Sequence, residues 1–305
     1  MARSWQDAIS REELDALLAM SDWRSWLSVA TNWGLVGAAM ALVTVWPNPL
    51  TVIAALFVIG ARQLGFAVLM HEGAHRSLFK SRLVNDWVAN WLCAYPVWGD
   101  LVPYRPYHLQ HHSKTWTKDD PDLGLATPFP ITRASLGRKL WRDLSGQTGW
   151  KRAKATLRRD LGTSRGRVRR VDFMGTRNLR GVVVTNLALL GVLAALGHPA
   201  LYLLWVGAWF TTYSVVMRIR SIAEHAMIDD PGDPLRNTRT TLARWWERLL
   251  VAPNCVNFHL EHHLAMTVPH YRLRRMHRLL VARGVLADAC VTRGYRAVLA
   301  RAASR

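Results

Sequence analysis

The amino-acid sequence predicts an all-α integral membrane protein, with four transmembrane helices arranged in two hairpins and a cytoplasmic cap. Three observations lead to this prediction: two long stretches without charged residues, a turn in the middle of each, and basic residues concentrated outside them. The 305 residues are 50% hydrophobic and 10% aromatic, which excludes a disordered chain. The three cysteines, Cys93, Cys255 and Cys290, lie far apart without a C-x-x-C pair, which excludes a disulfide scaffold.

The N-terminal segment, residues 1–26, is expected to form a cytoplasmic amphipathic region ahead of the first span. It mixes both signs of charge and lacks the apolar run of a signal peptide. Ser10 and Glu13 have the three-residue spacing of a capping box, which predicts that a short amphipathic helix begins there.

The two charge-free stretches cover residues 27–61 and 181–217, and they contain 35 and 37 residues. Each is nearly twice the ~20 residues that a helix needs to cross a bilayer. Proline interrupts both, in the W-P-N-P at residues 46–49 and the G-H-P at residues 197–199, so each stretch is expected to form a helical hairpin. Buried helices of a soluble protein explain them less well, because Trp residues near their ends are typical of membrane interfaces. The predicted spans are residues 27–46, 50–70, 181–197 and 200–217.

The distribution of basic residues predicts the orientation of the chain. Three precede the first stretch, 21 lie in residues 71–180 and 15 follow the second stretch, whereas the two turns have none. Because Lys and Arg are concentrated in cytoplasmic loops, both termini and the regions 71–180 and 218–275 are expected to be cytoplasmic. We therefore predict a membrane domain over residues 27–275 and a basic cytoplasmic tail over residues 276–305.

The net charge of +19 is concentrated in residues 133–180, which contain 15 Lys or Arg and three acids, with Trp141 and Trp150 among them. This composition suits helices that lie on anionic lipid headgroups. Nucleic-acid binding would use the same charges but would leave the apolar spans unexplained, so no nucleic-acid partner is predicted. Residues 87–99 form another charge-free stretch, which at 13 residues is too short to span and is predicted to be interfacial or re-entrant.

Eight histidines form three compact clusters, in which spacings of three and four residues bring side chains together on a helix. A ninth histidine stands just beyond the fourth span. Clustered imidazoles would repel if protonated and lose solvation if buried neutral, and metal binding removes both problems. Neutral imidazole suits iron, zinc or copper, and eight or nine ligands exceed what one ion uses, so two metals are predicted. The predicted ligands are His71, His75, His108, His111, His112, His225, His259, His262 and His263.

For other residues near the clusters, the sequence predicts less specific roles. His71-Glu72-x-x-His75 also matches the H-E-x-x-H signature of zinc proteases, a class that gives no role to the other two clusters. Three further histidines are expected to be hydrogen-bonded side chains near the interface: His198, His270 and His277. Candidates for orienting the imidazoles or holding a metal-bound water are Glu72, Asp100, Asp119, Asp120, Asp122, Glu224, Asn254, Asn257 and Glu261. Four aromatic residues are expected to lie at the membrane interface, and their alternative role is to line a substrate channel: Trp98, Tyr104, Tyr107 and Trp116.

The three clusters, H-x-x-x-H, H-x-x-H-H and H-x-x-H-H, are set around two membrane hairpins. In this they resemble the histidine boxes of the membrane fatty acid desaturase superfamily, which includes hydroxylases and carotenoid ketolases. The resemblance extends from about residue 27 to about residue 275, and residues 71–76, 218–225 and 257–263 look like the bacterial branch. It implies a non-haem di-iron centre at the cytoplasmic face, with the eight box histidines as ligands and His225 as an additional one.

The resemblance also implies an activity: an O2-dependent oxidoreductase, most directly a fatty acid or acyl-lipid desaturase. A hydroxylase or ketolase acting on another lipid or a carotenoid is the alternative, since the same ligands serve both outcomes. The chain has no H-P-G-G haem motif and too few cysteines for an iron–sulfur carrier of its own. A separate ferredoxin, rubredoxin or cytochrome b5 type protein, with its reductase, is therefore expected to dock on the basic cytoplasmic surface. Arg outnumbers Lys 34 to 6, which favours a bacterial plasma membrane.

Overall fold

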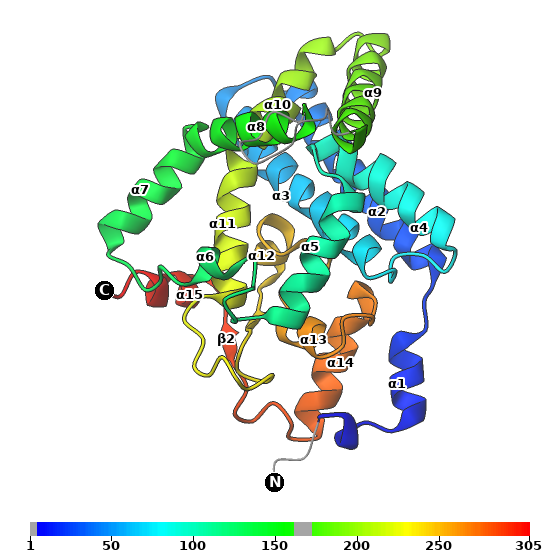
Figure 1. Cartoon of the computed structure of the whole chain (residues 1–305). Coiled ribbons are helices and arrows are strands. Elements are labelled where there is room, and N and C mark those ends of the chain that lie inside the picture. Colours follow the sequence, from blue (N-terminus) through cyan, green and yellow to red (C-terminus); the bar gives the residue numbers. More distant parts are fainter. Residues whose placement is uncertain (1–4, 162–172) are drawn as a thin grey trace.

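The computed structural model of the chain describes residues 5–161 and 173–305, so part of the basic segment lies outside the described residues. The described chain is mostly helical, which confirms the predicted helical class, and it also contains one small sheet that was not predicted (Figure 1). The elements are η1 (Trp5–Ala8), α1 (Arg11–Leu18), α2 (Asp22–Val45), α3 (Pro49–Ala74), α4 (Arg82–Val88), η2 (Ala89–Ala94), η3 (Tyr95–Val97), α5 (Leu101–Lys114), α6 (Leu123–Ala126), α7 (Arg133–Leu144), α8 (Gln147–Asp160), α9 (Phe173–Ala195), η4 (Pro199–Leu201), α10 (Tyr202–Phe210), α11 (Thr212–His225), β1 (Thr240–Leu242), α12 (Trp245–Leu250), η5 (Pro253–Cys255), α13 (His259–Leu264), α14 (His270–Ala282), β2 (Val291–Arg293) and α15 (Tyr295–Ala302).

Helix α1 begins at the predicted capping box. The Ser10 side chain accepts a hydrogen bond from the Glu13 backbone N–H at 3.2 Å, and the Ser10 backbone N–H donates to the Glu13 carboxylate at 2.9 Å. The helix packs against α14, and its Leu17 is fully buried there. The N-terminal segment is thereby fixed to the C-terminal part of the chain.

The first predicted hairpin is formed by α2 and α3. Asn48 accepts hydrogen bonds from the first backbone N–H groups of α3, and Pro49 occupies the first helical position, where its missing N–H costs nothing. The C-terminal half of α3 is buried on all sides, because α2, α5, α10 and α11 surround it. The last turn of α3 carries the first histidine cluster.

Three helical stretches among the described residues are long and apolar enough to cross a membrane: Asp22–Val45, Pro49–Ala74 and Pro199–His225. The predicted third span falls on α9, whose apolar part, Leu179–Ala195, is shorter. These helices support a membrane protein, while the number of four spans stays a prediction.

The second hairpin differs from the prediction at its fourth span, which is not one straight helix. The helix breaks between α10 and α11 at Thr211, where φ is −113° and ψ is −88°. Gly149 of α8 packs so closely there that a Cβ atom would lie 2.2 Å from the Phe210 carbonyl oxygen. The break therefore has a tertiary cause, the close approach of α8.

Helices α7 and α8 are basic and amphipathic, as predicted for the part of this segment that is described. Trp141 and Trp150 are exposed, whereas Asp143 is buried and pairs with Arg218 of α11. Residues 87–99, predicted to be interfacial or re-entrant, form the end of α4 and the short helices η2 and η3, which pack against α3.

The C-terminal third of the chain packs on both hairpins, with α12 and η5 on α3 and with β1 and α15 on α11. Strands β1 and β2 pair in parallel, with Thr240 opposite Val291. The domain boundary predicted at residue 275 falls inside α14, and β2 and α15 follow it. Because α15 packs on α11, the end of the chain is joined to the helix that carries His225.

The arrangement places the ends of four helices together. In Figure 1, α9 and α10 lie at the top, and α1 and α14 lie toward the opposite end. The C-terminal ends of α3 and α11 point into the region between these layers, where α5 and α13 also lie. The histidine clusters occupy these four elements.

Candidate metal centre

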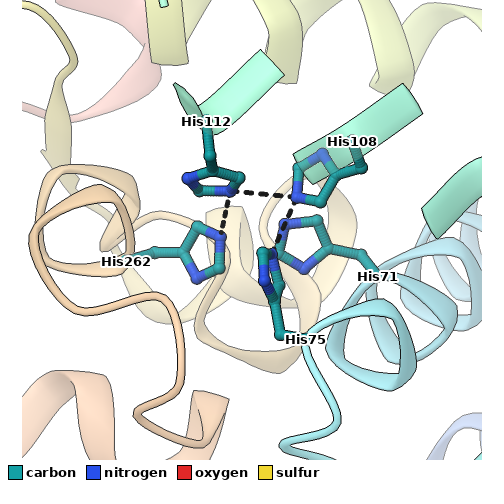
Figure 2. A group of neighbouring side chains, drawn as sticks. All are labelled: His71, His75, His108, His112 and His262. Carbon is teal, nitrogen blue, oxygen red and sulfur yellow. Dashed lines mark hydrogen bonds between the residues drawn. The ribbon is translucent and has the colours of Figure 1, made fainter. Parts of the chain in front are cut away.

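The structure brings all nine predicted histidines together, in two groups. Within each group, one nitrogen from every ring lies within 4.8 Å of one nitrogen from every other ring. The first, the five-histidine group, consists of His71, His75, His108, His112 and His262 (Figure 2). The second, the four-histidine group, consists of His111, His225, His259 and His263.

The division follows helix geometry. Pairs four residues apart, such as His71 and His75 or His108 and His112, enter the same group, because i and i+4 side chains share a helix face. The middle histidine of each H-x-x-H-H cluster, His111 or His262, belongs to the other group. Each of these two clusters therefore supplies side chains to both groups.

The five-histidine group has its Nε2 atoms directed inward. The Nε2 atom of His108 lies 2.9 Å from that of His75 and 3.0 Å from that of His112, which lies 3.0 Å from that of His262 (Figure 2). The His71 ring completes the group, 4.3 Å from the His108 ring between centroids.

The four-histidine group lies beside it. The Nε2 atoms of His225 and His259 are 2.8 Å apart, and the ring of His111 lies 4.7 Å from that of His225. The two groups touch where the rings of His112 and His263 stack with centroids 4.2 Å apart. Two ions held by these groups would therefore be neighbours.

The chemistry of the donor set fits metal ions. A neutral imidazole nitrogen is either a donor or an acceptor, so the Nε2 atom of His108 cannot satisfy two other Nε2 atoms with a single proton. Among the described residues, the buried Nε2 atoms of His71 and His263 have no hydrogen-bond partner. Orphaned, converging lone pairs of this kind suit a cation.

Burial keeps these imidazoles available as ligands. Removal from water, together with the other imidazoles nearby, lowers the pKa of His108, His262 and His263 well below the ordinary 6.5. The rings are therefore neutral at physiological pH, the form that binds metal.

Arg105 of α5 holds the first cluster in place. Its guanidinium donates to the carbonyl oxygens of Gly73 at 3.0 Å and Ala74 at 3.2 Å, and it pairs with Asp86 at 2.5 Å. These carbonyls lie in the last turn of α3, where the helix supplies no i+4 backbone donor. One side chain thus caps the helix of the first box and ties it to the helix of the second.

Arg239 has the same role at the end of α11. It is 1% exposed, and its guanidinium donates to the carbonyl oxygens of Ala223 at 3.1 Å and Met227 at 2.7 Å, on either side of His225. The Arg239 backbone N–H donates to the Glu224 backbone carbonyl at 2.9 Å. Neither this residue nor Arg105 was predicted, because a lone arginine has no local sequence signal for a contact that is distant along the chain.

Several predicted acidic partners do contact the ligand histidines. Asp120 accepts a hydrogen bond from His111 Nδ1 at 2.8 Å, Glu224 lies 3.5 Å from His259 Nδ1, and Glu72 lies 3.4 Å from His71 Nδ1. Such partners fix the ring and the tautomer of a ligand. Asp119 is exposed instead, and Asp100 caps α5 through the backbone N–H of Val102.

The other three histidines do not join the groups. His198 is exposed in the hairpin turn, whereas His270 and His277 are buried. The His270 backbone N–H donates to Glu72 at 2.9 Å, and His277 Nδ1 lies 2.6 Å from Glu261. Both side chains are hydrogen-bonded, as predicted: the His277 ring bonds Glu261, whereas Nε2 of the His270 ring lies 2.8 Å from the Ser28 hydroxyl.

The two asparagines proposed for a metal-bound water have different positions. Asn254 lines a small cavity together with His71, His259 and His262. Asn257 donates to the Thr241 carbonyl at 2.9 Å and fixes β1 to the loop before α13. Trp116 likewise bonds a backbone carbonyl, that of Asn237.

A second, larger cavity, of about 220 Å³, reaches both groups. It is lined by histidines of each group, and Tyr104, Met217 and Leu125 supply part of its wall. The Tyr104 ring stacks on His108 at 5.2 Å. The charged side chains of Asp122, Arg220 and Glu224 also line it, so the cavity is a mixed polar and apolar space beside both groups.

Comparison with known proteins gives the family. A family model described as fatty acid desaturase matches residues 44–296. The dihydrorhizobitoxine desaturase of Bradyrhizobium elkanii is 26% identical over 268 residues, which cover 82% of this chain and 73% of that protein. The sn-1 oleoyl-lipid 12-desaturase of Arthrospira platensis is 24% identical over 286 residues, covering 83% and 74%. The chain belongs to the fatty acid desaturase family, and it is a membrane oxidoreductase of the desaturase type.

Proposed function

We propose that the chain is an O2-dependent acyl-lipid desaturase whose nine histidines hold two non-haem irons, five on one ion and four on the other. The observation that carries this proposal is the division of the imidazoles into two adjoining groups, each with ring nitrogens within 4.8 Å of one another. One ion cannot use nine ligands, whereas two neighbouring ions can.

The proposed reaction converts a –CH2–CH2– segment, O2, two electrons and two protons into –CH=CH– and two waters. Two bound ferrous ions supply the reduction of O2 and the removal of hydrogen from unactivated carbon. The side chains of this protein have the remaining tasks. Asp120 orients the His111 ring, Glu224 and Glu72 lie beside the rings of His259 and His71, and the cavity beside Tyr104 would hold the reacting carbons near both groups.

Competing functions are less well supported. A hydroxylase or ketolase would use the same ligands, but the relatives are named desaturases. A zinc protease needs Glu72 as a general base beside a metal-bound water. Glu72 instead accepts hydrogen bonds from Ser77 at 3.1 Å and from the His270 backbone at 2.9 Å. An acyl-lipid substrate is favoured by the oleoyl-lipid in the name of the Arthrospira relative.

The proposed topology has four spans in a bacterial plasma membrane, with both termini and the metal centre on the cytoplasmic side. The three long apolar stretches and the apolar part of α9 support it, as does the absence of basic residues from the two hairpin turns. A membrane-embedded acyl chain would then approach the centre from the bilayer. Electrons would come from a separate ferredoxin, rubredoxin or cytochrome b5 type protein and its reductase.

Lipid profiling tests the proposed function. Cells that express the full chain are compared with cells that express His111→Ala, and fatty acids are analysed by mass spectrometry for new double bonds. We expect a new unsaturated species only with the wild-type chain, although both proteins are present in the membrane. Hydroxylated or keto lipids in its place, or no new product from an iron-loaded chain supplied with reductant, would contradict the proposal.

A further inference from the structure

We propose that the outer face of α14 is the docking surface for an acidic electron-transfer protein. This inference rests on the proposed function, which requires an external electron source, and it assigns that source to one surface. We call this surface the α14 arginine face, and it consists of Arg274, Arg275 and Arg278. All three residues are exposed.

Helix α14 is amphipathic. Leu273, Met276 and Leu280 are buried in a hydrophobic cluster with Phe258 and Leu260, next to the third histidine box. The three arginines project from the opposite, exposed side. A partner that binds them is therefore separated from the third box by the thickness of one helix, about 10–12 Å.

The buried side of α14 is hydrogen-bonded to two carboxylates, Glu261 and Glu72, that neighbour predicted ligands in the chain. His277 Nδ1 lies 2.6 Å from Glu261, which stands between the ligands His259 and His262 in α13. At the start of α14, the His270 backbone N–H donates to Glu72, the neighbour of the ligand His71. The helix that carries the arginine face is thus joined by hydrogen bonds to two histidine boxes.

The arginine face borders a hollow between α1 and α14. The hollow is about 350 Å³ and is lined by Glu13, Arg275, Arg278 and two apolar residues. Glu13 is the one acidic residue in this lining and also pairs with Arg283 at 3.0 Å, so the hollow keeps a net positive charge. This is the complement that an acidic side chain of a partner would fill.

An acidic protein fits this face better than a lipid surface does. The basic helices α7 and α8 expose Trp141 and Trp150, the mixture expected of an interfacial helix. Helix α14, all of which is described, exposes no aromatic side chain, and Val281 is its one exposed large hydrophobic residue. It also lies toward the end of the molecule opposite α9 and α10 (Figure 1).

The test uses the full chain, loaded with iron in lipid nanodiscs, and an acidic plant-type [2Fe–2S] ferredoxin with its NADPH-dependent reductase as the probe. The test variant is Arg274→Glu/Arg275→Glu/Arg278→Glu. The matched control, Arg138→Glu/Arg142→Glu/Lys151→Glu, makes the same change of charge on exposed residues of α7 and α8. A third protein, with Lys at the three α14 positions, keeps the charge.

At about 0.02 M salt, we expect the Kd for ferredoxin of the α14 glutamate variant to be about tenfold or more above that of the wild type. At about 0.5 M salt, the two Kd values should be nearly equal, because salt screens the charges. The α7–α8 control and the lysine variant should bind nearly as the wild type does. If the α14 variant and the α7–α8 control lose ferredoxin affinity equally, the attraction is unspecific. If the α14 variant binds ferredoxin as the wild type does, the partner docks elsewhere. Either result overturns the proposal.

Two further measurements separate this proposal from the proposed function and from misfolding. After chemical reduction with dithionite, a single turnover with O2 needs no ferredoxin, so the α14 variant should form as much product as the wild type does. If it does not, while the lysine variant does, the face acts on the centre itself and the docking proposal is wrong. If even the wild type forms no product, the proposed function fails, while the ferredoxin Kd still decides the docking surface.

Discussion

At the scale of single residues, His111 illustrates how a predicted ligand is oriented. Its Nδ1 donates to Asp120, because an ionised carboxylate can only accept, and this leaves Nε2 for the four-histidine group. The Asp120 carboxylate is itself held in place, since it accepts hydrogen bonds from the backbone N–H groups of Trp116 and Asp122, at 2.9 Å each. The His111 ring therefore has one orientation before any metal binds.

This arrangement gives a prediction for metal affinity. Replacement of Asp120 by Ala should raise the Kd for Fe(II) about 10- to 100-fold, because the His111 ring loses its orientation and its basicity falls. The Asp119→Ala variant is the control, since Asp119 is the exposed neighbour. Titration of the metal-free proteins with Fe(II) measures both, and equal affinities for the two variants would refute a role for Asp120.

Sequence spacing predicts the nine histidines but not how they are shared. His111 and His112 are adjacent in the chain yet enter different groups, as do His262 and His263. Neighbours on a helix differ by about 100° in direction, so their partners depend on which helices pack on either side. The arginine caps could not be predicted for the same reason, since Arg105 and Arg239 act on helix ends distant in sequence.

At the scale of elements, a buried polar network joins the first hairpin to the loop before the third box. Arg62 of α3 is 4% exposed, and it donates to the Leu249 carbonyl and to Asn32 Oδ1. Asn32 in turn donates to Asn254 at 3.1 Å, and Asn254 donates to the Gly65 carbonyl at 2.8 Å. Arg62 therefore faces the helix bundle, one of the two positions that are admissible for a charge inside a span.

The network predicts a loss of stability when Arg62 is removed. In Arg62→Met, the Leu249 carbonyl and the Asn32 side chain each lose a buried partner, and the free energy of unfolding should fall by about 1–3 kcal/mol. The control is Arg82→Met, at an exposed position at the start of α4. Denaturant unfolding in the same detergent compares them, and an Arg62→Met protein as stable as the control would contradict this account.

Helix ends with local signals are predicted well from sequence, and tertiary features are not. The capping box of α1 and the Asn48-Pro49 start of α3 depend on neighbours in the chain, and both are present. The break at Thr211 depends on Gly149 of α8, and the sheet consists of two strands of three residues, too short for an alternating pattern.

At the scale of the whole molecule, long apolar helices and more polar elements meet at the histidines. The ends of α3 and α11 supply the first box and His225, and α5 and α13 supply the rest. The proposed reaction needs such a meeting point, because its acyl substrate would lie in the lipid while its electrons would arrive from water.

The iron content of the purified chain tests the central claim most directly, with one variant for each group. The wild type should contain about two irons per chain by elemental analysis, with an anomalous-scattering peak in each histidine group. His225→Ala should lose the iron of the four-histidine group, and His71→Ala that of the five-histidine group, while the other peak remains. A single zinc per chain, or two irons that lie outside these groups, would contradict the account.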